Sequence, residues 1–592
     1  MAASPRQFYE DLSKVKEKEG LIIKSRLRLF GWIRILNGLL ILAAAVLLFR
    51  EELPGSGWTL LALIALFLIL VRFHSRWEEK GEKNDFYLHF IRQELKALEG
   101  EFSAFRTGSD YIDALHPYSL DLDLFGSRSI YQLICRTTTE DGAHQLALLL
   151  SCPYASPSEY LRRQEIISEL SLLPEFLIEY RVAGAGFAEQ AGDTGRIKEW
   201  LQKKDAFRSK AWMRLYVLII PPITVLLAVL YFMGLVPGVW FILVAVVNWI
   251  ILGLMGKAIK ELSLYVGRSA KLLGKYEALL ERLKLQEFQT VKWQRQAANA
   301  YNGIIQFRKL VQLFEARFNP LVGPLVNTFF LFDIYCAIRL ENWRKRFKAA
   351  VEEGLDVVAE VDLYVSLAQY AFDRPLYRYP TFSDTTAYEA ENIRHPLLRD
   401  QAIGNDMSLG NRQQFYLLTG ANMTGKSTFI RTLGVNLILG YCGLPVASDR
   451  VSLPVLKLYT AMRITDSVQD DVSYFRAELN RISGMMNAAA TDDHPFMVLL
   501  DEPLRGTNTT DKQQGTKAII EKLLCLKAIG IVATHDTVLC GLEEDYPQKI
   551  SNFHFESRLI QNELVFDYKL KRGGSTSNNA TILMQQLGII NS

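Results

Sequence analysis

The fold is decided by one stretch of sequence, Phe415-Tyr416-Leu417-Leu418-Thr419-Gly420-Ala421-Asn422-Met423-Thr424-Gly425-Lys426-Ser427-Thr428. It opens on an apolar run, which predicts a buried strand, and residues 429–440 continue as an apolar helix. The loop between them fits G-x-x-x-x-G-K-[ST], a pattern whose backbone N–H groups surround phosphates at a helix N-terminus. The alternative is a glycine-rich turn in an ordinary α/β unit. The strand before the loop and the helix after it favour a nucleotide site.

Each residue type in this loop has a physical role in holding a nucleotide. A Cβ on either glycine would block the close approach of backbone to phosphate. The lysine reaches the β- and γ-phosphates as a mobile point charge, and the Ser427 hydroxyl ligates Mg²⁺. We therefore predict that ATP and Mg²⁺ bind here. The predicted nucleotide-binding residues are Gly420, Ala421, Asn422, Met423, Thr424, Gly425, Lys426, Ser427 and Thr428.

Length and composition indicate several domains and some membrane segments. The chain has 592 residues, 49% of them hydrophobic, and a net charge of +3. That charge gives no global electrostatic argument for nucleic-acid binding. The six cysteines are scattered without C-x-x-C spacing, which indicates small buried hydrophobes in a reducing compartment. We expect no structural metal.

Two apolar hairpins predict four membrane-spanning helices. Residues 35–49 and 58–71 are apolar and flank a short turn, and residues 215–236 and 239–255 are joined only by Pro237-Gly238. A signal peptide is unlikely because the second apolar run follows at once without a cleavage site. The alternative for the first hairpin is a buried helical pair in a soluble core.

Charge around the hairpins predicts their orientation. Basic residues lie before residue 35, at 203–210 and at 257–260, whereas both turns carry almost no positive charge. The positive-inside rule therefore places both termini and everything after residue 257 in the cytoplasm of a multi-pass cell-membrane protein surrounded by lipid. An amphipathic helix is expected over 78–105, and residues 262–287 and 301–371 have a helical period.

Two further strand ends carry candidate catalytic residues. The apolar strand at 496–500 ends in Asp501-Glu502, where Asp501 is positioned to hold Mg²⁺ through water and Glu502 to polarise the attacking water. The strand at 529–533 is followed by His535, which can sense the γ-phosphate. Either motif alone is common in structural roles, but both follow the phosphate loop in the order that the chemistry requires.

Several segments resemble the MutS family. Residues 124–127, 134–139 and 160–167 resemble the start of its helical core, residues 355–372 its core helix, and Arg394-His395-Pro396-Leu397 its entry to the ATPase domain. Residues 470–478 resemble the family's "S.F..E" segment, which implies that Ser473 acts on the nucleotide of a partner subunit, in a homodimer. Segments 505–511 and 573–588 resemble family signatures as well. The resemblance is close over about 390–592 and loose before it.

The departures from the family bear on function. Ala421 and Thr424 stand where Pro and Gly are usual, and Gln401-Ala402-Ile403 replace the aromatic that stacks on adenine, so the adenine contact is open. The mismatch-reading motif Phe-x-Glu has no convincing counterpart, because Phe8-Tyr9-Glu10 leaves no room for a domain of about 100 residues before the membrane. Phe187-Ala188-Glu189 lies inside the core segment.

These patterns together predict a multidomain α and α/β protein with two transmembrane hairpins, a helical MutS-like core and a C-terminal P-loop ATPase domain. The predicted segments are 1–75 (basic segment and hairpin), 76–115 (juxtamembrane helix), 116–210 (core, first part), 211–256 (second hairpin), 257–390 (helical core) and 391–592 (ATPase). The favoured function is a membrane-anchored MutS-like ATPase that binds and hydrolyses ATP at a dimer interface. We expect this activity to be coupled to DNA or to a nucleoid-linked partner, in a role like DNA mismatch repair or in DNA maintenance. The alternatives are an ATP-switched membrane scaffold and a transport-associated ATPase.

Overall fold

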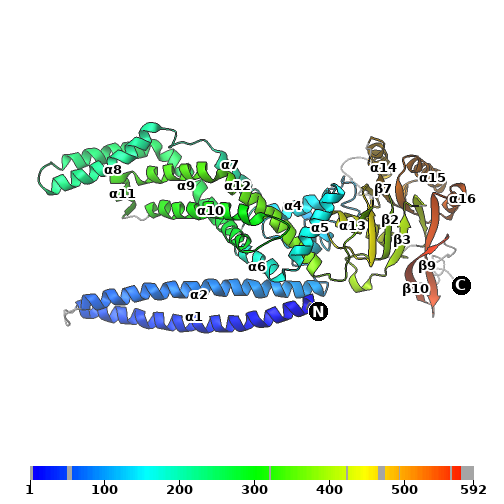
Figure 1. Cartoon of the computed structure of the whole chain (residues 1–592), viewed down its shortest axis with the longest axis horizontal. Coiled ribbons are helices and arrows are strands. Elements are labelled where there is room, and N and C mark those ends of the chain that lie inside the picture. Colours follow the sequence, from blue (N-terminus) through cyan, green and yellow to red (C-terminus); the bar gives the residue numbers. More distant parts are fainter. Residues whose placement is uncertain are drawn as a thin grey trace. The chain divides into compact units, whose positions relative to one another are not determined.

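The computed structural model forms two compact units (Figure 1). One comprises residues 1–95, 137–143 and 173–363, and the other residues 96–136, 144–172 and 364–592. Within the chain the structure describes residues 4–49, 56–187, 189–318, 322–383, 385–411, 413–421, 424–463, 474–491, 494–560 and 563–574.

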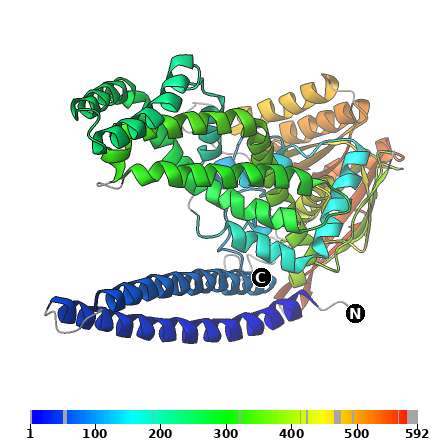
Figure 2. The ribbon, with the colours of Figure 1, turned by 60° about the vertical axis from the view of Figure 1, so that its left-hand side comes forward.

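In its described residues the first unit is helical. Its helices are α1 (Pro5–Phe49), α2 (Ser56–Leu98), α6 (Pro174–Gly184), α7 (Asp193–Gln202), α8 (Ala211–Phe232), α9 (Val239–Leu285), α10 (Trp293–Glu315), α11 (Val322–Phe330) and α12 (Phe332–Phe372). The ends of α2 and α12 belong to the second unit. α1 lies along α2, and α10 lies along α9 (Figures 1 and 2).

The four predicted apolar runs fall on α1, α2, α8 and α9, except that residues 233–236 of the third run lie beyond the end of α8. Among the described residues, these four helices are long and apolar enough to cross a membrane, and only 6–11% of each most apolar window is buried. α1 and α2 continue well beyond their apolar runs, and α2 ends at Leu98, before the predicted end at 105. Pro221 and Pro222 lie inside α8.

Buried polar contacts hold distant segments of the first unit together. The Asp362 carboxylate on α12 accepts hydrogen bonds from the backbone N–H groups of Thr138 and Thr139, at 2.9 and 2.7 Å. Lys275 on α9 pairs with Glu189 at 2.6 Å, and both side chains are almost fully buried. Glu189 therefore has a structural partner inside the helical core, where the sequence also placed it.

The second unit contains two sheets. Its remaining helices are α3 (Ile130–Ile134), α4 (Glu140–Ser151, whose first turn belongs to the first unit), α5 (Pro157–Ser171), α13 (Lys426–Tyr441), α14 (Tyr474–Thr491), α15 (Thr509–Cys525) and α16 (Leu542–Asp545). A four-stranded sheet has the order β1-β5-β2-β3, from Thr381–Ser383, Arg450–Pro454, Tyr388–Ile393 and Asn405–Leu409. A six-stranded sheet has the order β10-β9-β4-β8-β7-β6, from Glu563–Arg572, Ile550–Ile560, Phe415–Thr419, Ile529–Ala533, Phe496–Asp501 and Lys457–Ala461.

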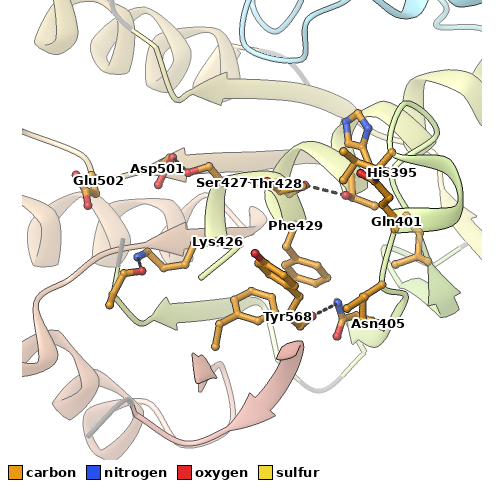
Figure 3. Close-up of a pocket in the computed structure, with 18 of the residues that line it drawn as sticks. His395, Gln401, Asn405, Lys426, Ser427, Thr428, Phe429, Asp501, Glu502 and Tyr568 are labelled. Carbon is orange, nitrogen blue, oxygen red and sulfur yellow. Dashed lines mark hydrogen bonds between the residues drawn. The ribbon is translucent and has the colours of Figure 1, made fainter. Parts of the chain in front are cut away.

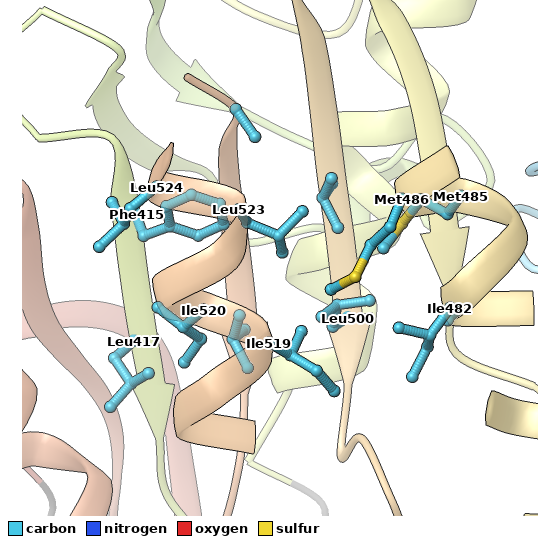
Figure 4. Close-up of a cluster of buried hydrophobic side chains, with 14 of the residues drawn as sticks. Phe415, Leu417, Ile482, Met485, Met486, Leu500, Ile519, Ile520, Leu523 and Leu524 are labelled. Atoms are coloured by element: carbon cyan, nitrogen blue, oxygen red, sulfur yellow. The ribbon is translucent and has the colours of Figure 1, made fainter. Parts of the chain in front are cut away.

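The core of this unit lies where α14 and α15 cover the six-stranded sheet (Figure 4). Phe415 and Leu417 of β4 and Leu500 of β7 pack with Ile520 and Leu523 of α15. Every residue of β4, β7 and β8 is buried, which explains their continuous apolar sequences. Each buried Val, Leu, Ile, Phe or Met side chain contributes about 1.5–3 kcal/mol, so the central strands form a stable support for the loops at their ends.

Candidate nucleotide site

Strand register brings three loops to one edge of the six-stranded sheet. β4, β8 and β7 are parallel neighbours, and Leu418, Ala533 and Asp501 lie side by side across them. The Thr534 N–H also donates to the Leu418 carbonyl at 3.0 Å. The phosphate loop, His535 and Glu502 each follow one of these strands directly, so they share the carboxyl edge of the sheet, where α/β folds bind ligands.

The two loop glycines adopt backbone conformations that side chains disfavour. Gly420 has φ of 139° and Gly425, the residue before α13, has φ of 102°. A Cβ on Gly420 would lie 2.9 Å from the Phe555 carbonyl oxygen, and one on Gly425 would lie 3.0 Å from a ring carbon of Tyr568. The sequence predicted these glycines only from the close approach of phosphate. The contacts show that the fold also requires glycine at both positions. Asn422 and Met423 lie outside the described residues.

Lys426 is buried against the carbonyl groups of its own loop. Its ammonium donates to the Gly420 oxygen at 2.5 Å and to the Ala421 oxygen at 2.9 Å. Burial lowers the pKa of Lys426, and the nearby carboxylates Glu502 and Asp501 oppose that shift. The group is thus positioned at the loop mouth with two hydrogen bonds that phosphate oxygens can replace.

Two oxygen groups that suit Mg²⁺ lie together at the start of α13. The Ser427 hydroxyl donates to an Asp501 carboxylate oxygen at 2.5 Å. Mg²⁺ prefers oxygen ligands in octahedral geometry and binds through one or two protein groups plus water and phosphate. The pair fits that ion. No group of three or more His, Cys, Asp or Glu side chains with metal-binding geometry occurs in the described part of the chain.

Glu502 occupies a strained turn after β7. Its φ is 50° and that of Leu504 is 64°, both unusual for residues with a side chain. The Glu502 N–H donates to the Ala533 carbonyl at 2.9 Å, and the Leu504 N–H donates to a Glu478 carboxylate oxygen of α14 at 2.7 Å. Glu478 is buried, and burial raises its pKa. It had no predicted role, yet it holds the turn that carries the candidate base.

The Glu502 carboxylate has two cationic or polar partners. Arg505 Nε lies 2.9 Å from one oxygen, and His535 Nε2 contacts the other. The other ring nitrogen of His535 lies 3.4 Å from the Gly420 carbonyl oxygen. The structure therefore brings Glu502 and His535 together beside the phosphate loop. They meet because β7 and β8, the strands that precede them, are parallel neighbours. Ser473 lies outside the described residues.

A pocket of about 490 Å³ opens beside the loop (Figure 3). Its lining includes Lys426, Ser427, Thr428, Asp501 and Glu502 at one end, and Ile403, Phe429 and Tyr568 elsewhere. Tyr568 belongs to β10, at an irregularity in the pairing between Phe566 and Leu570, where it has φ of 50°. Asn405 of β3 fixes this residue, since its side-chain amide donates to the Tyr568 carbonyl at 3.0 Å.

An aromatic ring is thus present although the segment 401–403 lacks one. It comes from about 160 residues later in the chain, and the sequence near Asn405 contains no sign of it. The Tyr568 ring reaches the pocket because β10 pairs with β9 at the edge of the six-stranded sheet, and this pairing is known only from the structure.

Residues 416–589 match the family model of MutS domain V. This part of the chain belongs to the MutS family. MutS domain V is a P-loop ATPase domain, and MutS proteins use ATP, typically with Mg²⁺. Similar curated proteins include "MutS protein homolog 4" of Homo sapiens, 30% identical over 38% of this chain and 24% of that protein. "DNA mismatch repair protein MutS" of Staphylococcus haemolyticus is 28% identical over 40% of the chain and 27% of that protein. The Thermotoga maritima protein of the same name is 32% identical over 34% of this chain and 26% of that protein.

The match spans only about a quarter of the length of these MutS relatives. It covers the domain that contains the phosphate loop, Asp501, Glu502 and His535. The MutS assignment therefore concerns the ATPase domain.

Proposed function

We propose that this chain is a Mg²⁺-dependent ATPase. The convergence of the phosphate loop, the Ser427–Asp501 pair and Glu502 at three neighbouring strand ends carries the proposal. Lys426 exchanges its loop carbonyls for the β- and γ-phosphates. Ser427 and Asp501 would hold Mg²⁺, which would supply positive charge to offset the charge that develops on the phosphates. Glu502, once released from Arg505, orients and polarises the attacking water, with His535 beside it.

The adenine base fits the apolar end of the pocket. Tyr568 offers a ring face, and Ile403 and Phe429 offer apolar contacts. This arrangement replaces the aromatic that is missing near Asn405.

Two substitutions test the chemistry. Glu502→Gln should bind ATP but hydrolyse it at least a hundredfold more slowly, because the base is lost while the Mg²⁺ ligands remain. Lys426→Ala should lose both ATP hydrolysis and ATP affinity. Glu544→Gln, an exposed carboxylate on α16, is the matched control and should keep the wild-type rate. Wild-type turnover by Glu502→Gln in a phosphate-release assay would refute the assignment of the base.

The active unit is proposed to be a homodimer in which Ser473 completes the site of the partner. Ser473→Arg and Lys426→Ala proteins should each be inactive alone, and mixing them should restore about one working site per heterodimer. Full activity of a strictly monomeric protein would rule this out.

The four apolar helices are proposed to span the cell membrane, with the ATPase domain and both termini in the cytoplasm. Their largely uncovered apolar windows and the basic flanks on one side support this topology. A cysteine introduced at Gly238 should react with an impermeant thiol reagent from outside intact cells, and one at Ser592 should not. The reverse labelling pattern would invert the topology.

DNA is the proposed partner, because similar proteins carry mismatch-repair names. Binding by the solubilised protein should be backbone-directed and fall steeply with salt. Matched and mismatched duplexes should bind within tenfold of each other, a difference below about 1.4 kcal/mol. A stronger mismatch preference would reveal a base-reading element, and salt-independent or absent binding would favour the ATP-switched scaffold or the transport-associated ATPase.

A further inference from the structure

Helix α11 is a short apolar helix between α10 and α12. It covers Val322–Phe330, and it meets α12 at a bend of 80° where Leu331 has φ of 50°. Leu325 is 60% exposed, and Phe330 is also exposed. α11 contacts both α8 and α9, the two helices of the second hairpin. Apart from the C-terminal end of α12, all of these elements belong to the first unit.

Side chains of the second hairpin satisfy the C-terminal carbonyls of α11. The last carbonyls of a helix have no partner within it and usually bind water. Here the Asn248 amide of α9 donates to the Thr328 carbonyl at 2.7 Å. The Thr224 hydroxyl of α8 lies 3.2 Å from the Phe329 carbonyl and shares its single hydrogen with the Ile220 carbonyl of its own helix at 2.8 Å. The Trp249 indole also donates to the Thr328 hydroxyl at 3.1 Å.

These donors lie deep within the apolar hairpin. Thr224 lies well inside α8, which ends at Phe232, and Asn248 lies near the middle of the apolar run 239–255. Both are almost fully buried, with 3% and 0% exposure. Polar groups at such a depth are costly unless protein groups pair with them, and irregular backbone there must be satisfied by protein. The Asn248 amide and the Thr328 carbonyl satisfy each other, and the Thr224 hydroxyl lies within hydrogen-bond distance of the next α11 carbonyl.

Charged residues flank α11 on both sides. Arg317, before α11, pairs at 3.5 Å with Asp333, at the start of α12, and contacts the Ser263 hydroxyl. Ser263 lies on α9 beyond the basic residues Lys257 and Lys260, which mark the cytoplasmic flank. α11 therefore begins near a charged, cytoplasmic level of α9 and ends beside residues well inside the apolar hairpin.

We propose that α11 is a re-entrant helix that enters the cytoplasmic half of the bilayer and exposes Leu325 and Phe330 to lipid hydrocarbon. The inference rests on the proposed spanning of α8 and α9. Nine residues rise about 14 Å, about half of a hydrocarbon core of about 30 Å. The figure of about 14 Å is an upper limit on the depth, because Asp333, three residues after Phe330, already pairs with Arg317 at the charged level. α11 therefore enters obliquely, and α12 starts from the bend at Leu331.

Spin labels on the full-length protein in lipid nanodiscs test this proposal. Single cysteines at Leu325, Phe330, Leu226 and Leu285 are labelled in a background whose exposed cysteines, Cys152 and Cys525, are replaced by serine. Leu226 is an exposed residue of α8 and serves as the lipid control, and Leu285 is an exposed residue at the end of α9 and serves as the water control. Collision rates with oxygen, which concentrates in lipid, and with a water-soluble nickel chelate are compared at each site.

We expect labels at Leu325 and Phe330 to favour oxygen as the Leu226 label does, at least threefold more than the Leu285 label. If the Leu226 label favours oxygen but the Leu325 label favours the nickel chelate, as the Leu285 label does, the re-entrant helix is refuted and the spanning hairpin is not. A Leu325 label hidden from both reagents would mean that protein covers α11, which also overturns the proposal. A water-like Leu226 would refute the membrane topology itself.

Discussion

Acidification should destabilise the nucleotide-binding domain through His395. The side chain is 8% exposed, and burial lowers its pKa from 6.5 to about 4, with the Arg431 guanidinium adding to the effect and Asp123 opposing it. The Leu397 N–H also donates to His395 Nδ1 at 3.3 Å, so this nitrogen acts as an acceptor in the folded state. Protonation would place a buried charge near the Arg431 guanidinium and break that bond.

The sign and size of the effect follow from the two pKa values. Between pH 6.5 and 4 the unfolded chain binds a proton that the folded chain does not, so the free energy of unfolding falls as the pH falls. The stabilising difference is fully present above the unfolded pKa and is lost as the pH falls toward the folded pKa. With values of 6.5 and about 4, the loss between pH 7 and pH 5 is about 2 kcal/mol.

The assay must report on the second unit alone. All nine tryptophans belong to the first unit, so tryptophan fluorescence does not monitor the ATPase domain. The buried thiol of Cys442 does, when urea-treated samples are pulse-labelled at one fixed pH and analysed by mass spectrometry. Between pH 7 and pH 5, the free energy of unfolding of the second unit should fall by about 2 kcal/mol less in His395→Gln than in wild type. His494→Gln, an exposed histidine of the same unit, should keep the wild-type dependence. Equal losses in wild type and His395→Gln would refute a buried neutral imidazole.

Three further substitutions test the site and its support. Tyr568→Ala should weaken ATP binding about fivefold to tenfold, and Tyr568→Phe should restore it, because a ring contact contributes about 1 kcal/mol; calorimetric titration measures both. Glu478→Leu should lower the turnover number at least tenfold with little change in ATP affinity, since the turn that carries Glu502 loses its anchor, whereas Glu478→Gln keeps an acceptor and most of the rate. Gly530→Ala should destabilise the second unit by more than 3 kcal/mol in the Cys442 assay, because its Cβ would meet the backbone of β7 at Val498.

The elements that the sequence predicted well are those with one dominant local signal. The apolar runs at 415–419, 496–501 and 529–533 are buried strands, and α13 begins at the lysine of the phosphate loop. Parallel strands put their carboxyl ends on one edge, so residues after each strand meet without any further information. Their catalytic roles remain predictions.

The features that sequence reasoning missed depend on distant contacts. Tyr568 reaches the pocket only because β10 pairs with β9 and an irregularity turns its backbone. The helical period of 301–371 also concealed the break around α11, because apolar spacing continues through it. Gly323-Pro324 was the available signal, since this pair is typical of a helix start and not of an interior.

The principal groups of the candidate site are paired with other protein groups. Lys426 binds loop carbonyls, Ser427 binds Asp501, and Glu502 binds Arg505 and His535. In the proposed mechanism ATP and Mg²⁺ would exchange these contacts, so the net binding energy would be smaller than the new contacts alone would give. The exchange at Glu502 would matter most for turnover, because pairing with Arg505 competes with the polarisation of water. An event that moves Arg505 away from Glu502 would then control hydrolysis without touching the phosphates.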